Sequence, residues 1–170
     1  MSTTAAPDAR LSTSTDLSSE AVAAVTEAVN PLVADAFALY LKTKNFHWHL
    51  SGPRFRDLHL LFDEHAEAIF ASIDVLAERV RKIGGTTIRS ISHVSELQTI
   101  ADDNDDYVSA DEMVQRLCDD NRHMAESLRK AHGACDDAGD VATTSILEVL
   151  IDETERRTWF LFEISQEEGE

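Results

Sequence analysis

The side chains best suited to metal chemistry lie between residues 47 and 78, where two histidines and three carboxylates recur at helical spacing. These residues are His47, His59, Asp63, Asp74 and Glu78. His59 and Asp63 are four residues apart, as are Asp74 and Glu78, so each pair shares one face of a helix. Imidazole combined with carboxylate is a donor set that suits Fe(II). The spacing therefore indicates an iron site.

One subunit cannot bring both pairs to the same metal ion. At about 1.5 Å per residue, His59 and Asp74 lie roughly 22 Å apart along one helix. Either there are two separate sites, or a second subunit packs antiparallel and brings its own Asp74 and Glu78 opposite His47 and His59. A two-fold dimer of that kind would carry two equivalent sites.

The elements that hold these residues are predicted to be long helices. Apolar residues at helical spacing indicate a first helix from Ser18 or Ser19 to just before residues 51–53, where a glycine and a proline follow. Pro31 lies inside this helix and is expected to kink it or to mark a restart. A second helix is predicted over residues 55–83.

Two further helices follow a long connection. Residues 86–108 form this connection, with a short helix expected near residues 95–100 and an acidic run at 102–106 that we interpret as a solvated loop. A capping-box pattern at Ser109 opens the third helix, which breaks at Gly133 to Gly139, and Asp140 can cap the fourth. We therefore predict an all-α, ferritin-like four-helix bundle with a long crossover between helices two and three.

Composition favours one acidic domain. The 170-residue chain has a formal net charge of -17, which attracts cations and repels nucleic acid and anionic lipid. We expect a flexible tail over residues 1–17 and the bundle over residues 18–166. Cys118 and Cys135 match no metal-ligand spacing, so we interpret them as reduced thiols of a cytoplasmic protein. We expect no secretory signal and no membrane span, because no apolar run approaches the ~20 residues that a bilayer requires.

Two stretches of the chain resemble the signature region of the Dps proteins, the DNA-protecting proteins of starved cells. They are KTKNFHWHLSGPRFRDLHLLFDEH at residues 42–65 and IDVLAERVRKIGG at residues 73–85. The likeness is close over the first two helices and looser to about residue 165. All five ligand-type residues match the family in type and in spacing.

The resemblance implies a hollow dodecamer built from two-fold dimers, with a ferroxidase centre shared across each two-fold interface. His47 of one subunit would be a primary iron ligand, with Asp74 and Glu78 from the neighbour. His59 and Asp63 would complete a second, weaker iron position. Iron(II) would be oxidised, preferably by hydrogen peroxide, and stored as ferric mineral, which protects the cell against oxidative damage.

The resemblance also places carboxylates along the path of iron. A pore through which iron enters is expected at the start of the fourth helix, lined by Asp136, Asp137 and Asp140. Ser145 stands where many relatives carry another aspartate, so this chain departs from the family at that point. Glu64 and Glu67 are candidates for mineral nucleation on the cavity wall, and a plain surface role fits them equally well.

The remaining aromatic and histidine residues are less specific. Trp48 matches a tryptophan beside the family's iron centre, and Trp159 is expected in the core. His65 lies about 200° around the helix from Asp63 and should point away from it. We interpret His49 and His65 as polar or surface histidines, with an extra metal site as the alternative. Three more histidines show no paired spacing and are interpreted as structural or exposed: His93, His123 and His132.

Two alternatives to an iron oxidase remain open. One is a non-catalytic nucleoid protein that protects DNA, and the other is a cage that holds zinc or another ion and oxidises iron slowly. Relatives that condense DNA often use a tail rich in lysine or arginine. Here the N-terminal tail carries only Arg10, and residues 165–170 carry no basic side chain. Because twelve acidic subunits would repel phosphate, we expect no DNA binding.

Overall fold

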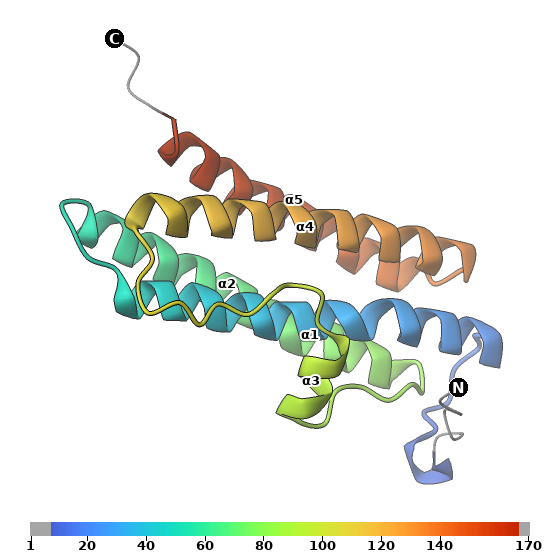
Figure 1. Cartoon of the computed structure of the whole chain (residues 1–170). Coiled ribbons are helices and arrows are strands. Elements are labelled where there is room, and N and C mark those ends of the chain that lie inside the picture. The colour runs from blue at the N-terminus through green and yellow to red at the C-terminus, as the bar shows by residue number, and fades with distance from the viewer. Residues whose placement is uncertain (1–7, 167–170) are drawn as a thin grey trace.

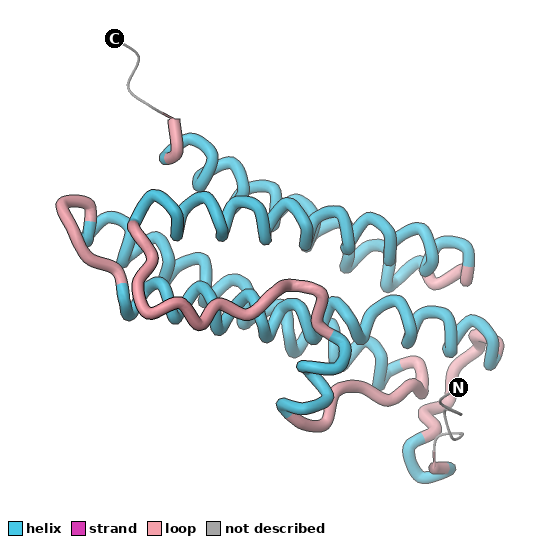
Figure 2. Tube along the Cα trace, viewed as in Figure 1, coloured by secondary structure: helices cyan, strands magenta, loops and turns pink. Residues whose placement is uncertain are grey.

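The computed structural model describes residues 8–166, and this part of the chain contains helices and no strand (Figures 1 and 2). The elements are a 3-10 turn, η1, and five α-helices: η1 Ala9–Leu11, α1 Ser19–His49, α2 Phe55–Lys82, α3 Ile91–Leu97, α4 Ala110–Asp137 and α5 Val141–Ile164. The four long helices form two antiparallel pairs, α1 with α2 and α4 with α5, joined by a long crossover that contains α3 (Figure 1). The predicted fold class is confirmed.

The core lies between the two helix pairs and draws large apolar side chains from all four long helices. The largest fully buried ones are Leu32, Leu39, Phe46, Phe62, Ile69, Leu76, Met113, Leu117, Leu128, Leu147 and Leu161. Each such burial contributes about 1.5–3 kcal/mol relative to an exposed side chain. This interior holds α1 and α2 in the fixed register on which the candidate site depends.

Helix α1 is the most enclosed helix, because it packs against α2, α3 and α4. It runs from Ser19 to His49 through Pro31, so of the two outcomes expected at this proline, a kink or a restart, the restart is wrong. By length and composition alone, α1 is also apolar enough to cross a membrane. The sequence reading missed this feature. A helix covered on several sides must be apolar around much of its circumference, which explains its composition.

A buried carboxylate on α1 fixes the crossover. Asp35 is 1 % exposed. It accepts hydrogen bonds from the backbone N–H groups of Thr99 at 2.5 Å and Ile100 at 3.0 Å, and from the Thr99 hydroxyl at 2.7 Å. These bonds hold residues 99 and 100 outside any helix. The predicted short helix at 95–100 is therefore misplaced, and α3 ends at Leu97.

The helix starts follow the predicted capping residues. Ser18, Ser109 and Asp140 each accept a hydrogen bond from a backbone N–H three residues further on. The predicted break at Gly133 is wrong, since α4 continues to Asp137. Gly139 then turns the chain into α5 with a positive φ of 74°, a conformation that favours glycine.

The described part of the N-terminal segment contacts the end of α2. The Thr13 hydroxyl donates to the carbonyl of Arg81 at 2.9 Å, and the Arg81 guanidinium donates to the carbonyl of Leu11 at 2.9 Å. A side chain at Gly84 would place its Cβ 2.9 Å from the Thr13 carbonyl oxygen, which explains the glycine there. Residues 1–7 of the expected flexible tail lie outside the described residues, and its boundary at residue 17 stays a prediction.

Candidate metal centre

Two histidines are stacked where α1 ends and α2 begins. The ring centroids of His47 and His59 lie 3.7 Å apart at an interplanar angle of 18°. The Nδ1 of His47 lies 2.8 Å from the carbonyl oxygen of His59, and the Nδ1 of His59 lies 3.0 Å from the carbonyl oxygen of His47. A carbonyl only accepts, so each Nδ1 carries a proton, and in the neutral form of either ring the lone pair is on Nε2. This tautomer is the one in which Nε2 can bind a metal ion.

The turn between the helices produces this pairing. Leu50 is buried after the last turn of α1, and Gly52 adopts a positive φ of 110° that reverses the chain. Phe55 opens α2 and stacks on the outer face of His59, with ring centroids 4.9 Å apart. The His59 ring is therefore packed between an imidazole and a phenyl ring, which limits its rotation.

A carboxylate and a lysine lie beside the histidine pair. Asp63 Oδ1 is 2.6 Å from the Lys44 Nζ and 3.9 Å from the His47 Nε2. The hydrogen bond from Lys44 lowers the pKa of Asp63, which keeps this carboxyl ionised. The exposed Trp48 ring lies one turn beyond Lys44, with its centroid 5.9 Å from the Nζ. The sequence reading did not single out Lys44, although its position four residues before Trp48 on one helix face was available.

The other two proposed ligands do not join this cluster. Asp74 and Glu78 are exposed further along α2, and Glu78 lies 3.7 Å from Lys82. Across residues 8–166, no group of three or more histidine, cysteine or acidic side chains is placed to hold a metal ion within one chain. Within the described residues, His47, His59 and Asp63 therefore lie apart from the Asp74 and Glu78 pair.

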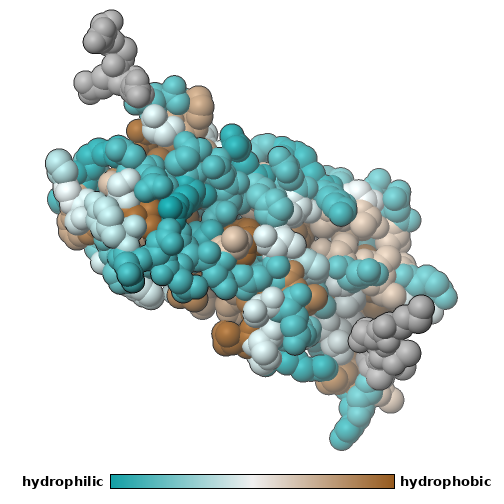
Figure 3. All heavy atoms as spheres, in the orientation of Figure 1, coloured by the Kyte–Doolittle hydropathy of each residue, from teal (hydrophilic) through white to brown (hydrophobic). Residues whose placement is uncertain are grey.

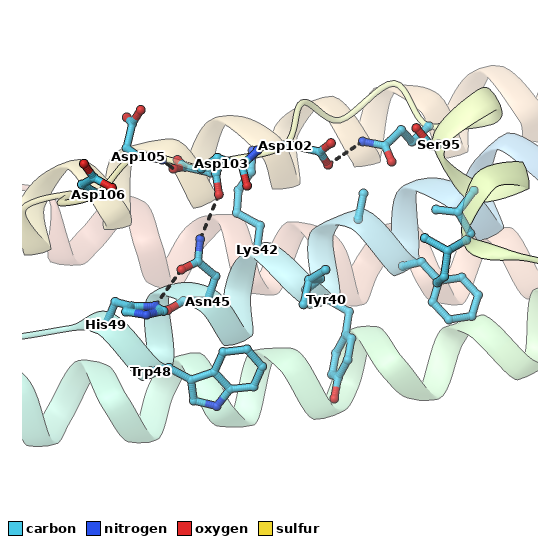
Figure 4. Close-up of a pocket in the computed structure, with 17 residues that line it drawn as sticks. Tyr40, Lys42, Asn45, Trp48, His49, Ser95, Asp102, Asp103, Asp105 and Asp106 are labelled. Atoms are coloured by element: carbon cyan, nitrogen blue, oxygen red, sulfur yellow. Dashed lines mark hydrogen bonds between the residues drawn. The ribbon is translucent and has the colours of Figure 1, made fainter.

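Two contiguous grooves lie along α1 and the crossover, and His47, His59 and Asp63 line neither of them. The first, of about 790 Å³, runs along α1 past Tyr40 and Trp48 (Figure 4). The second, of about 720 Å³, passes Phe70 and reaches Asp74. They share three lining residues: Phe37, Ile91 and Val94. Apolar atoms beside the crossover also interrupt the largely hydrophilic face seen in Figure 3.

One wall of the first groove is polar and belongs to the acidic loop. In Figure 4, Asn45 connects His49 to Asp103: its Oδ1 lies 2.8 Å from the His49 Nδ1, and its Nδ2 donates to the Asp103 carbonyl at 3.2 Å. Asp103 and Asp105 also bind Arg116, at 2.7 and 2.8 Å. This loop is held by the protein's own cations and amides, which fits the interpretation of the run as a loop.

His65 does not fit the surface interpretation. It points away from Asp63, as expected, but it is 2 % exposed and packs toward Phe160, with ring centroids 6.3 Å apart. Neither ring nitrogen has a hydrogen-bond partner within the described residues. Burial, followed by the nearby charges of Arg157 and Arg156, lowers the pKa of His65 to about 3. His65 is therefore a neutral interior side chain.

The expected pore residues divide into two environments. Asp136 and Asp137 are exposed at the end of α4, and Ser145 is exposed on α5. Asp140 is 3 % exposed and accepts hydrogen bonds from Arg79 at 2.7 Å, from the Thr143 N–H and from the Thr143 hydroxyl. Both Asp140 oxygens are engaged within the subunit, so this side chain does not face solvent.

The other predicted residues lie mostly at the surface. Glu64 and Glu67 are exposed, and Glu64 lies 3.5 Å from Arg156. Trp159 is 59 % exposed and donates to Glu163 at 3.0 Å, so its predicted core position is wrong. The three histidines whose sequence spacing suggested no metal site are partly or fully exposed: His93, His123 and His132. The thiols of Cys118 and Cys135 are free and buried, and burial raises the pKa of Cys135 to about 11.

Comparison with known proteins relates this architecture to one family. The family described as Ferritin-like domain matches residues 26–167. The chain is 37% identical to an uncharacterized low temperature-induced protein of Nostoc sp., over 78% of this chain and 75% of that protein. It is 35% identical to the DNA protection during starvation protein of Brevibacillus brevis, over 78% of this chain and 89% of that protein. DpsC from Streptomyces coelicolor has a TM-score of 0.89 at 26% identity, covering 93% of this chain and 92% of that chain.

Proposed function

The chain belongs to the Dps family of ferritin-like proteins, and from this we propose that it oxidises iron(II), preferably with hydrogen peroxide, and stores the ferric product in a hollow dodecamer. The observation that carries the proposal is the stacked His47–His59 pair, whose two Nε2 lone pairs are free beside the ionised Asp63. This nitrogen and oxygen donor set fits iron(II). Nothing in the comparisons points to zinc.

The proposed centre is completed by a second copy of the chain. His47 would hold the primary iron together with Asp74 and Glu78 of the partner subunit, and His59 and Asp63 would supply a second position. Two observations support a shared site: within the described residues Asp74 and Glu78 lie apart from His47, His59 and Asp63, and an exposed groove lined by Phe70 and Ile73 reaches Asp74. Burial of this groove would drive the association, and two-fold symmetry would create two centres per dimer.

The proposed reaction removes two hazardous reagents together. Two iron(II) ions each lose one electron, and one hydrogen peroxide with two protons becomes two waters, so no hydroxyl radical is released. The imidazoles and carboxylates hold the iron ions, and the ionised carboxylates favour the more highly charged product. Trp48, exposed beside the histidines, would be covered by the partner and help to exclude water from the centre.

The path of iron is proposed to pass exposed carboxylates. Asp136 and Asp137 would line the pore, whereas the buried Asp140 would hold the turn that positions them. Glu67, which is exposed, and Glu64 would nucleate mineral on the cavity wall. We further propose a cytoplasmic location, in which the buried Cys118 and Cys135 thiols stay reduced.

The test is anaerobic loading with iron(II) followed by peroxide, with ferric absorbance as the readout. Wild type is compared with Asp74→Ala/Glu78→Ala. The control is Glu27→Ala/Glu126→Ala, which removes two other exposed carboxylates. We expect fast oxidation in the wild type and the control, with soluble iron that elutes together with a large shell. In Asp74→Ala/Glu78→Ala the reaction should be at least tenfold slower. Equal slow rates in all three proteins would show that the centre is not catalytic.

A further inference from the structure

A buried arginine on α5 bonds only to uncharged groups within the described part of the chain. Arg157 is 6 % exposed. Its Nε donates to the side-chain oxygen of Asn121 at 2.9 Å, and its Nη2 donates to the Thr154 hydroxyl oxygen at 2.9 Å. Among residues 8–166, no carboxylate forms an ion pair with this guanidinium. A charge in this position is costly, because a buried ion without a counter-ion destabilises a fold.

The guanidinium has a fixed orientation and unused donors. The Asn121 amide donates to the Leu117 carbonyl at 2.8 Å. The Thr154 hydroxyl donates to the Leu150 carbonyl at 2.7 Å, so both side chains are fixed as acceptors for the guanidinium. A guanidinium carries five N–H groups, and the bonds within the described residues use two of them, which leaves three for another acceptor. Burial lowers the pKa of Arg157 to about 10, so the group is still charged at neutral pH.

A second buried polar side chain faces the same turn of α5. His65 of α2 is 2 % exposed, and neither ring nitrogen has a partner within residues 8–166. Its ring packs toward Phe160, with centroids 6.3 Å apart, and Phe160 lies three residues after Arg157 on the same face of α5. Burial, and after it the charge of Arg157, lowers the pKa of His65, which agrees with this proximity. An unpaired imidazole and the unused donors of a guanidinium therefore lie near one another between α2 and α5.

The chemistry of these two side chains selects the class of ligand. The guanidinium supplies one positive charge and only donors, and a neutral imidazole adds one more N–H. A water molecule would satisfy these donors but leave the buried charge uncompensated, whereas an anion would do both. Since Arg157 supplies a single positive charge, a multiply charged anion would itself remain partly uncompensated in the interior.

We infer that Arg157 and His65 form an interior site for one small monovalent anion of the chloride type. The anion accepts from the unused N–H groups of Arg157 and from one N–H of His65. It bridges α2 and α5, which belong to different antiparallel helix pairs, and so joins the two halves of the bundle. Neither residue is a proposed iron ligand, so the inference does not depend on the proposed function.

The neighbouring arginine provides a matched control. The guanidinium carbon of Arg156 lies 4.5 Å from the centroid of the Phe160 ring, and its Nη1 lies 3.5 Å from Glu64. The Arg156 side chain is 53% exposed. Arg156→Met therefore removes a positive charge from the same turn of α5 without changing the inferred site. Arg157→Met removes the buried charge and keeps the length of the side chain, and His65→Leu removes only the weaker donor.

The direct test uses bromide in place of chloride, because the anomalous scattering of bromide locates it in a crystal. Crystals of the whole assembled protein, free of metal, are grown in sodium bromide. We expect one bromide per subunit within hydrogen-bonding distance of Arg157 and His65 in wild type and in Arg156→Met, and none there in Arg157→Met. Water alone at this position in wild type would overturn the inference, and that result requires no variant to fold.

A solution measurement distinguishes a resident anion from binding at crystal concentration only. Sodium gluconate, whose anion is too large for a buried site, is exchanged for sodium chloride at constant sodium concentration with EDTA present. The thermal unfolding midpoint of wild type and Arg156→Met should rise by at least about 3 °C over a titration to about 500 mM chloride. The rise should be smaller in His65→Leu and absent in Arg157→Met. Equal midpoints of wild type in the two salts, or an equal rise in wild type and Arg157→Met, would contradict the inference.

Discussion

Two histidines on α2 show how one residue type takes opposite roles. His59 satisfies its Nδ1 with a carbonyl and presents its Nε2 beside His47, whereas His65 is buried with neither nitrogen bonded. The hydrogen bond at Nδ1 of His59 orients its ring so that Nε2 is available to a metal ion. The burial of His65 instead lowers the stability of the fold, because an unpaired buried polar group costs about 1–3 kcal/mol.

His65 should therefore make the protein sensitive to acid. In the unfolded chain its pKa is near 6.5, and in the folded chain it is about 3, so between these values the unfolded state binds the extra proton. Stability then falls as pH falls through this window, by up to about 1.4 kcal/mol per pH unit. We expect His65→Leu to be at least as stable as wild type at pH 7 and to lose less stability between pH 6.5 and 4.

Denaturant unfolding at fixed protein concentration, at pH 7, 5.5 and 4.5, measures this slope. His49→Gln is the control, because the His49 ring is exposed. A His65→Leu protein whose stability declines with acid as steeply as that of wild type would contradict the prediction.

The sequence could predict the ligand-type residues but not all of their contacts. Spacing along one helix showed that His59 and Asp63 share a face, and the structure places both near His47. Burial of His65 depends on which helix covers the opposite face of α2. Likewise, the Lys44–Asp63 contact joins two helices and depends on their register. No local pattern contains either fact.

At the scale of elements, the α4–α5 turn separates a structural aspartate from two surface ones. Asp140 caps α5 and binds Arg79 of α2, so Asp140→Ala removes a helix cap and leaves a partly buried guanidinium without its partner. We expect a loss of about 2–3 kcal/mol of unfolding free energy, measured by denaturant titration. Asp136→Ala/Asp137→Ala should change stability by less than about 0.5 kcal/mol.

The two variants should rank in the opposite order when iron uptake is measured on equal amounts of folded protein: Asp136→Ala/Asp137→Ala should impair uptake more than Asp140→Ala. If the exposed pair lines the pore, Asp136→Ala/Asp137→Ala slows the first phase of iron(II) uptake, while the oxidation of iron(II) already inside the shell is unchanged. Uptake at the wild-type rate in this variant would remove both residues from the proposed pore.

Asp35 of α1 is a buried anchor of the crossover. Asp35→Ala would leave the N–H groups of Thr99 and Ile100 without their acceptor, so we expect a loss of about 3 kcal/mol. Hydrogen exchange should become faster mainly at these two amides. Thr99→Val removes only the hydroxyl and should cost about 1 kcal/mol. Equal exchange at residues 99 and 100 in wild type and Asp35→Ala would contradict this role.

The same anchor explains where helix prediction succeeded and where it failed. Long amphipathic stretches with local caps, such as the one that Ser109 opens, were predicted well because their determinants lie within a few residues. Helix α3 was placed too late in the chain because Asp35, far away in sequence, takes the hydrogen-bonding groups of residues 99 and 100. Trp159 was predicted in the core but is exposed, because aromatic character alone does not show which face of α5 points toward the core.

At the scale of the whole molecule, the two exposed grooves along α1 and the crossover predict how assembly can be disrupted. Ile91 is 79 % exposed in the isolated subunit and lines both grooves. Ile91→Glu should leave the helix content unchanged, because the side chain contributes little to the subunit core. If these grooves form the proposed dimer contact, a charge buried there should nevertheless shift the mass found by light scattering from that of the proposed twelve subunits, each of 18.9 kDa, toward smaller species. An unchanged mass would place the two-fold contact elsewhere.

The charge of the molecule opposes a role in DNA binding, although relatives carry the name DNA protection during starvation protein. The formal net charge is -17, and most arginine and lysine side chains of the described part already pair with carboxylates. The paired cations are Arg10, Lys42, Lys44, Arg54, Arg79, Lys82, Arg116, Arg122, Arg129 and Arg156. Few cations are left to contact phosphate, whereas DNA affinity depends on such contacts.

We therefore expect no shift of duplex DNA in gels run at about 150 mM salt with EDTA present, at protein concentrations that shift the DNA with a basic-tailed relative. EDTA is included because a divalent ion could bridge the acidic protein surface and the DNA phosphates. A shift that survives EDTA at this salt concentration would show a basic surface formed only in the assembly. Protection of DNA in the cell would then be physical as well as chemical, and the nucleoid role would gain direct support.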